Sequence, residues 1–130
     1  MSRALWQKLG YRRGLVAHLD EVPEGYRTWL RGLPQDVRLD GTLDDRPALV
    51  HHFTTEAEGL GTRLAVFLDA IPPDGAIWVS WPKKSSGVPT DLNGDACRAA
   101  AFPLGLVDVK VCAVDDVWTA QKLVLRKALR

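Results

Sequence analysis

Short apolar runs and longer amphipathic segments alternate along the chain. Apolar runs of about four to eight residues bounded by glycine, proline or acidic residues are typical of strands, and apolar residues three or four positions apart are typical of helices that cover a sheet. The run AIWVSW is almost continuously apolar, which predicts a strand covered on both faces. The segments that predict strands are 14–20, 36–40, 48–55, 76–81, 106–114 and 120–129.

Helical spacing of apolar residues is found between most of these strands. Pro23 suits a first helical turn, and Thr55 and Glu58 have the spacing of a capping box. Farther along the chain, either Thr90 or Asp91 can serve as a helix cap. The segments that predict helices in this part of the chain are 23–33, 55–71 and 90–102.

The order of these segments predicts one three-layer α/β domain over residues 1–130. A chain of 130 residues is long enough for one compact core and too short for two ordinary domains. Parallel neighbours need crossover helices, whereas the last two strands follow one another through the short turn DDVWT. We therefore expect a Rossmann-like, mostly parallel sheet that ends in a C-terminal antiparallel hairpin.

Residues 1–10 predict a short N-terminal helix capped by Ser2. Its apolar residues Leu5, Trp6 and Leu9 share one side, so we expect it to pack across the edge of the domain. If these side chains are exposed, they form a seam for a homodimer. A structural role in a homodimer is therefore one of the functions that the sequence leaves open.

Charge and composition exclude several classes of partner. The formal net charge of +1 provides no overall field toward nucleic acid or an anionic membrane, so neither partner is expected. No apolar stretch is long enough to cross a bilayer or to act as a signal sequence, which predicts a cytoplasmic location. Cys97 and Cys112 lie in different predicted elements without metal-binding spacing, and we expect both to be reduced core thiols.

The loop SWPKKSSGVPTD follows a predicted central strand, where the crevices of parallel sheets form. Its lysines supply charge, its serines supply hydroxyls, and the prolines at 82 and 89 stiffen it. We predict that it binds a small anionic ligand or a protein partner. The alternative is structural: the tryptophan fills the core, a cap ends the loop, and the lysines are solvated. The predicted binding residues are Trp81, Lys83, Lys84, Ser86, Gly87, Thr90 and Asp91.

The segment IPPDGAIWVSW and the overall plan resemble class I S-adenosylmethionine-dependent methyltransferases in reduced form. The resemblance implies a methyltransferase-like fold with cofactor-binding acids after the first two strands, which here are Asp20 and Asp40. The loop DEVPEGY has a single glycine, Gly25, and carries acids that repel a pyrophosphate, which argues against NAD and FAD. We expect no cofactor, with S-adenosylmethionine as the alternative because its cationic groups tolerate acids. Asp40 is otherwise a turn residue of a fold that has lost its cofactor.

A second resemblance covers most of the chain from about residue 10. WPKKSSGVPTDLNGD and GLVDVKVCAVD are similar to the motifs of a family of small bacterial proteins of unknown function. The chain departs from that family's pattern at Gly94 and Asp95, where members commonly carry the acidic residue earlier. The family implies no activity, so the leading hypothesis remains a non-catalytic binding protein and the alternative a methyltransferase-like enzyme.

The histidines give only weak indications of chemistry. His51 and His52 are adjacent on a predicted strand, so their side chains should point to opposite faces and not share a metal. His18 could lie near either of them, and a hydrogen-bonded structural role is the alternative. Asp115 and Asp116 in the last turn could border a pocket or simply form the turn. No Ser/His/Asp or Cys/His set has supporting local sequence, so no catalytic or metal-binding residue is predicted.

Overall fold

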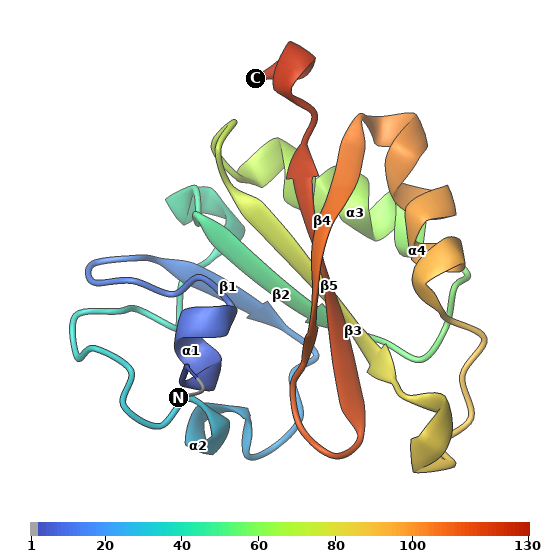
Figure 1. Ribbon diagram of the computed structural model, residues 1–130. Coiled ribbons are helices and arrows are strands. Elements are labelled where there is room, and N and C mark those ends of the chain that lie inside the picture. Colours follow the sequence, from blue (N-terminus) through green and yellow to red (C-terminus); the bar gives the residue numbers. More distant parts are fainter. Residues whose placement is uncertain (1–2) are drawn as a thin grey trace.

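A five-stranded mixed sheet forms the centre of the protein (Figure 1). The computed structural model describes residues 3–130, so the predicted cap Ser2 lies outside the described residues. The strand order is β1-β2-β3-β5-β4, in which β1, β2 and β3 are parallel and the β4–β5 hairpin is antiparallel. The strands are Ala17–Asp20 (β1), Leu49–Phe53 (β2), Ala76–Pro82 (β3), Leu106–Ala113 (β4) and Trp118–Leu125 (β5). This arrangement confirms the predicted fold class.

Helices cover both faces of the sheet and complete the three layers. The α3 and α4 helices pack on one face, whereas the one-turn helices α1 and α2 lie on the other (Figure 1). The α-helices are Leu5–Lys8 (α1), Tyr26–Trp29 (α2), Leu60–Ala70 (α3) and Gly94–Ala101 (α4). Short 3-10 turns are formed by Leu43–Asp45 (η1), Lys84–Ser86 (η2), Phe102–Leu104 (η3) and Lys127–Leu129 (η4).

Each face of the sheet has its own apolar core. On the α3 and α4 face, Phe67 and Ile77 are fully buried, and on the other face Leu9 and Trp78 are fully buried. Each such side chain contributes roughly 1.5–3 kcal/mol relative to exposure. All five residues of β2 are buried, because this strand lies between two parallel neighbours and under helices on both faces.

The second and third helices are shorter than their apolar spacing predicts. Helix α2 ends at Trp29 because Leu30, with φ −90° and ψ 34°, leaves the helical region. Helix α3 begins after Gly59, whose φ of 79° is left-handed, and not at the predicted cap Thr55. The carbonyl of Thr55 instead accepts hydrogen bonds from the hydroxyl of Thr90 and the amide of Asp91.

The segment 36–40, predicted as a strand, forms only one parallel bridge, between Arg38 and Val16 beside β1. The brief strand predicted there is thus reduced to a single bridge, because only two of its residues, Val37 and Leu39, are apolar. The last strand is also shorter than predicted, since β5 ends at Leu125 and the chain turns at Arg126 into a 3-10 turn.

Helix α1 lies over a sheet face and not across the edge of the domain as expected. Its C-terminal end is fixed where the indole Nε1 of Trp78, on the central strand β3, donates to the carbonyl of Leu9 at 2.7 Å. Leu5 and Trp6 are half-buried against the same core. The apolar surface left on this helix for a homodimer seam is therefore small.

The two cysteines are free and buried, as predicted. Cys97 belongs to the core under α4, and Cys112 to the core on the opposite face. Between residues 3 and 130, the structure contains no helix with the length and apolar character that crossing a membrane requires.

Candidate functional site

A cleft of about 240 Å³ opens beyond the C-terminal ends of β1 and β2, beside the first turn of α3. Crevices at this position are where open α/β sheets bind ligands. Side chains that can carry charge dominate its wall: Asp20, Glu21, His52, Glu56, Glu58 and Arg63. Four carboxylates thus face one guanidinium, so the cleft favours a cationic ligand.

Three side chains form a connected polar network in this cleft. The Nδ1 of His52 donates to Oδ2 of Asp20 at 2.6 Å, and the Nη2 of Arg63 donates to Oδ1 of the same carboxylate at 2.9 Å. Arg63 also lies 5.3 Å above the ring of Phe67, a cation–π distance. Because each oxygen of Asp20 accepts one of these bonds, its orientation is fixed by two separate elements, β2 and α3.

Strand pairing brings the aspartate and the histidine together. Asp20 is the last residue of β1 and lies opposite His52 in the parallel register with β2. His52 points toward α3, with its ring 5.4 Å from that of Phe67, whereas His51 points to the α2 face and lies 5.1 Å from the ring of Tyr26. The prediction that the two histidines occupy opposite faces is confirmed.

The protonation of His52 reflects two opposing influences. Burial lowers the pKa of His52, and the hydrogen bond and charge of Asp20 oppose this shift. The imidazole is therefore neutral at pH 7, and its Nδ1 carries the proton that Asp20 accepts. The Nε2 then carries the lone pair, as in histidines that an aspartate orients for acid–base chemistry.

The loop after β1 is strained where it borders the cleft. Glu21 has a φ of 58°, a left-handed conformation that costs a non-glycine residue about 1 kcal/mol or more. Two residues later, Pro23 has no amide proton to offer a ligand. The loop therefore presents a carboxylate, and not a series of backbone donors, to the cleft.

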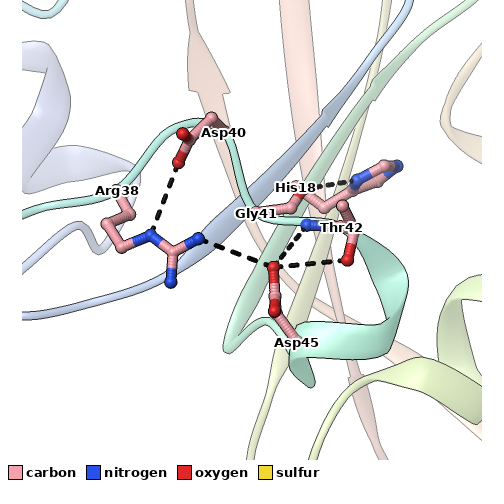
Figure 2. A network of polar contacts seen from close by, with 6 residues as sticks. All are labelled: His18, Arg38, Asp40, Gly41, Thr42 and Asp45. Atoms are coloured by element: carbon pink, nitrogen blue, oxygen red, sulfur yellow. Dashed lines mark hydrogen bonds and ion pairs between the residues drawn. The ribbon is translucent and has the colours of Figure 1, made fainter.

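Asp40, the second predicted cofactor residue, lies away from the cleft wall. Figure 2 shows its carboxylate beside the guanidinium of Arg38, 3.4 Å away, while the same guanidinium lies 3.6 Å from Asp45. The Asp40 side chain is 78% exposed. Of the two predicted cofactor residues, only Asp20 lies in the cleft; Asp40 belongs to a surface ion-pair cluster.

His18 takes part in the attachment of this surface segment to β1. Its Nδ1 donates to the carbonyl of Gly41 at 2.9 Å (Figure 2), which matches the structural alternative for this histidine. Among residues 3–130, no group of three or more histidine, cysteine or acidic side chains is arranged to hold a metal ion.

A separate chain of buried hydrogen bonds runs beneath the α1 and α2 layer. The hydroxyls of Tyr11 and Tyr26 lie 2.8 Å apart, Tyr26 lies 2.7 Å from Nδ1 of His51, and Nε2 of His51 lies 2.7 Å from the hydroxyl of Ser80. Burial lowers the pKa of His51 to about 3 and raises the pKa of both tyrosines. All four groups are therefore neutral at pH 7, as a fully satisfied polar network in a core requires.

The loop 81–91 is held by contacts with the core, with the β4–β5 turn and with the segment before α3. Trp81 is 7% exposed and belongs to the core under α3 and α4. The Nζ of Lys83 donates to the carbonyl of Asp115 at 2.7 Å, which ties the loop to the β4–β5 turn. Lys84 is exposed, so the two predicted lysines point to different surroundings. Asp115 also caps its own turn by accepting from the amides of Val117 and Trp118.

The remaining predicted loop residues join this loop to the segment before α3. The hydroxyl of Thr90 donates to the carbonyl of Thr55 at 2.7 Å, and a carboxylate oxygen of Asp91 accepts from the amide of Ala57 at 2.8 Å. Neither residue caps α4, because the side chain of Asn93 accepts from the amide of Ala96 at its start. Ser86 and Gly87 shape the 3-10 turn η2 and its end.

Sequence reasoning missed the cleft residues His52 and Arg63. Each looked ordinary in sequence: a histidine within an apolar strand and an arginine on the polar side of an amphipathic helix. The sequence feature that could have indicated the cleft was Asp20 at the end of β1. In a parallel sheet, this residue must lie beside the end of a neighbouring strand. The register that selects His52 is a property of the folded sheet.

The fold is similar to that of solved methyltransferases. A SAM-dependent methyltransferase from Aquifex aeolicus aligns with a TM-score of 0.61 and 10% identity, over 92% of this chain and 86% of that one. A TehB-like SAM-dependent methyltransferase from Corynebacterium glutamicum aligns with a TM-score of 0.56 and 12% identity, over 95% and 86% of the two chains. At such low identities the likeness establishes a methyltransferase-like Rossmann fold.

One solved neighbour holds its cofactor. Magnesium protoporphyrin IX methyltransferase from Synechocystis PCC 6803, with SAM bound, aligns with a TM-score of 0.55 and 9% identity, over 92% of this chain and 73% of that one. No protein-family model matches this chain, and no curated protein sequence matches it. The resemblance of the WPKK and GLVDVKV motifs to a small bacterial family therefore stays a prediction.

Proposed function

We propose that the cleft between Asp20 and Arg63 binds a small cationic ligand, with S-adenosylmethionine as the first candidate. The observation that carries the proposal is the acidic wall at the C-terminal ends of β1 and β2, in a chain with a methyltransferase-like fold. An ammonium or sulfonium group placed there gains from four carboxylates, of which only Asp20 is paired with a cation among residues 3–130.

The residues present fit the charges of S-adenosylmethionine better than its ribose. Glu56 and Glu58 are exposed at the mouth of the cleft and would hold its cationic groups, with Glu21 beside them. Asp40, the acid expected to hold the ribose hydroxyls, does not line the cleft, and Pro23 limits backbone donors. The proposal therefore rests on recognition of the ligand's positive charges. When bound, S-adenosylmethionine would supply a methyl group carried on its sulfonium.

His52 is the neutral imidazole in the wall of this cleft and can act as a general base. Its Nδ1 is committed to Asp20, which leaves the Nε2 lone pair for an acidic hydrogen of a second substrate. Asp20 would stabilise the imidazolium that results, and Arg63 keeps that carboxylate oriented. We include this acid–base role in the proposal as the chemistry that a methyl acceptor would need.

Calorimetric titration tests the ligand class directly. We expect S-adenosylmethionine to bind more tightly than S-adenosylhomocysteine, because the latter lacks the sulfonium charge that the carboxylates favour. The double variant Glu56→Gln/Glu58→Gln should weaken binding of S-adenosylmethionine about tenfold or more and reduce the preference over S-adenosylhomocysteine.

A matched control is available on α3 and the turn that follows it. Asp69 and Asp74 are exposed acids outside the cleft, so Asp69→Asn/Asp74→Asn removes the same charge without touching the cleft wall. If the two double variants weaken binding of S-adenosylmethionine equally, the loss of affinity is explained by net charge and not by the cleft wall. Absence of heat and of any thermal shift at millimolar S-adenosylmethionine would end the proposal and favour a fold kept without its cofactor.

The loop 81–91 remains a second candidate, for a small anionic ligand or a protein partner. Its support is a fixed turn: the hydroxyl of Ser86 donates to the carbonyl of Lys83 at 2.6 Å and accepts from the amide of Val88 at 3.2 Å, which presents Lys84 outward. Titration of phosphorylated metabolites against wild type and Lys84→Ala tests this role, and identical profiles would exclude it.

Solution mass by light scattering tests the predicted homodimer, and a strict monomer would exclude it.

A further inference from the structure

A cluster of cations lies far along the sheet from the acidic cleft, where β4 and β5 face the end of α1. Lys110 and Lys122 are directly opposite one another on these two strands. The Nζ of Lys110 donates to the carbonyl of Lys8 at 3.0 Å, and the Nζ of Lys122 lies 3.9 Å from the position that a Cβ on Gly10 would occupy. Both ammonium groups therefore reach the turn that follows α1.

A β-bulge creates this pairing. Asp108 lies opposite Leu123, and the next pair along the ladder joins Lys110 to Lys122, so Val109 is the extra residue. Without the bulge, Val109 would face Lys122. The bulge turns Val109 outward, where it is 55% exposed, and brings a second lysine onto the α1 face. Bulges of this kind commonly re-aim a side chain next to a functional site.

The pairing is unfavourable in the protein alone. Like charges directly opposite on neighbouring strands destabilise a sheet. Burial lowers the pKa of Lys122, and the charges of Lys110 and of Arg12 lower it further. No hydrogen bond or ion pair joins the side chain of Lys122 to another residue within 3–130, so its half-buried charge is uncompensated there.

We propose that Lys110 and Lys122, with Arg12 at the rim, form a binding site for phosphate groups on the α1 face of the β4–β5 hairpin. A phosphate oxygen between the two ammonium groups would replace their repulsion with charge-assisted hydrogen bonds. The exposed guanidinium of Arg12 would contact the same group or the next one in a polyphosphate. This site is independent of the acidic cleft and of the ligand proposed there.

Pyrophosphate at constant ionic strength is the probe that tests the site. We expect amide NMR shift changes concentrated at Gly10, Lys110 and Lys122, and an affinity that falls about tenfold or more in Lys122→Gln. Lys127→Gln removes an exposed lysine in the 3-10 turn η4 and should leave the affinity unchanged. Lys122→Gln should fold at least as stably as wild type, because the like-charge pair is relieved.

Further arms identify the source of the phosphate and separate this site from the cleft. Binding of pyrophosphate supports a free polyphosphate or a nucleotide as the ligand. If the protein binds a short RNA oligonucleotide but not pyrophosphate, and Lys122→Gln loses this binding, the ligand is a nucleic-acid backbone. Glu56→Gln/Glu58→Gln should keep the phosphate affinity even if its cationic ligand is lost. Equal pyrophosphate affinities of wild type and Lys122→Gln would overturn the proposal. Amide NMR shift changes spread over all exposed lysines would overturn it as well.

Discussion

The Nδ1 of His52 and the Oδ2 of Asp20 lie 2.6 Å apart and join the C-terminal ends of β1 and β2. This contact turns two strand ends into one polar site, because Arg63 from α3 holds the other oxygen of the same carboxylate. The network lies at the edge of the sheet where ligands of open α/β folds bind. Its integrity can be tested without knowledge of any ligand.

Substitution of Asp20 should change both the protonation of His52 and the stability of the protein. Asp20→Asn removes the negative charge that holds the pKa of His52 up and weakens the hydrogen bond to it, so this pKa should fall further below its ordinary value. The free energy of unfolding should decrease by about 1–3 kcal/mol, because the amide keeps one acceptor oxygen for two donors and Arg63 loses its opposite charge. Histidine NMR titration and urea unfolding measure the two effects. An unchanged His52 pKa would show that the contact does not persist in solution.

The buried His51 should make the protein sensitive to acid. Its pKa is about 3 in the folded state and about 6.5 unfolded, so between these values the unfolded state binds one more proton. The contribution of His51 to stability is therefore fully present above pH 6.5 and is lost as pH falls toward 3. Each pH unit within this window should cost up to about 1.4 kcal/mol.

The matched variant for this acid sensitivity is His51→Gln, which keeps hydrogen-bonding capacity without titration. Urea unfolding from pH 4 to 8 should give a shallower pH dependence for the variant, by about one proton. His52, whose pKa is also lowered, contributes in the same direction and is present in both proteins. Parallel curves for wild type and variant would contradict a neutral, buried His51.

A methyl group at Gly41 should separate the segment 38–41 from the start of β1, to which it is hydrogen-bonded. The added Cβ would lie 2.5 Å from Cγ1 of Val16 and 2.8 Å from the carbonyl oxygen of Ala17, which are closer than atoms can approach. Gly41→Ala should reduce the free energy of unfolding by about 1–3 kcal/mol. Amide exchange at Arg38, whose N–H donates to Leu15, should accelerate in the variant. Gly61→Ala in α3 is the control. Its added Cβ would lie 3.8 Å from the carbonyl oxygen of Ala100, an ordinary contact, so the variant should be as stable as wild type or more stable.

The two adjacent lysines of the loop should differ in their effect on stability. Lys83→Met removes the hydrogen bond to the carbonyl of Asp115 and should destabilise the protein by about 1 kcal/mol. Lys84→Met changes an exposed side chain and should stay within about 0.5 kcal/mol of wild type. Urea unfolding of both variants measures the difference. Equal effects would mean that the Lys83 contact contributes nothing measurable.

Local sequence predicted the elements with long, regular patterns. The apolar runs at β2 and β3 and the spacing in α3 predict their structures, because burial on both faces or along one helical stripe leaves a strong pattern. The segment 36–40 and the helix from Pro23 were overpredicted, since short patterns do not show whether a pairing partner or a second helical turn exists. The bulge at Val109 leaves no mark on the alternation of β4.

By itself, the sequence determined the fold class, the free buried cysteines and the opposite orientation of His51 and His52, because these follow from periodicity and burial of apolar side chains. Tertiary structure alone decided which distant residues meet. Strand register placed Asp20 against His52, and the bulge placed Lys110 against Lys122. Register and bulges depend on contacts between segments far apart in the chain, so the chemistry of both proposed sites arises only when the sheet is assembled.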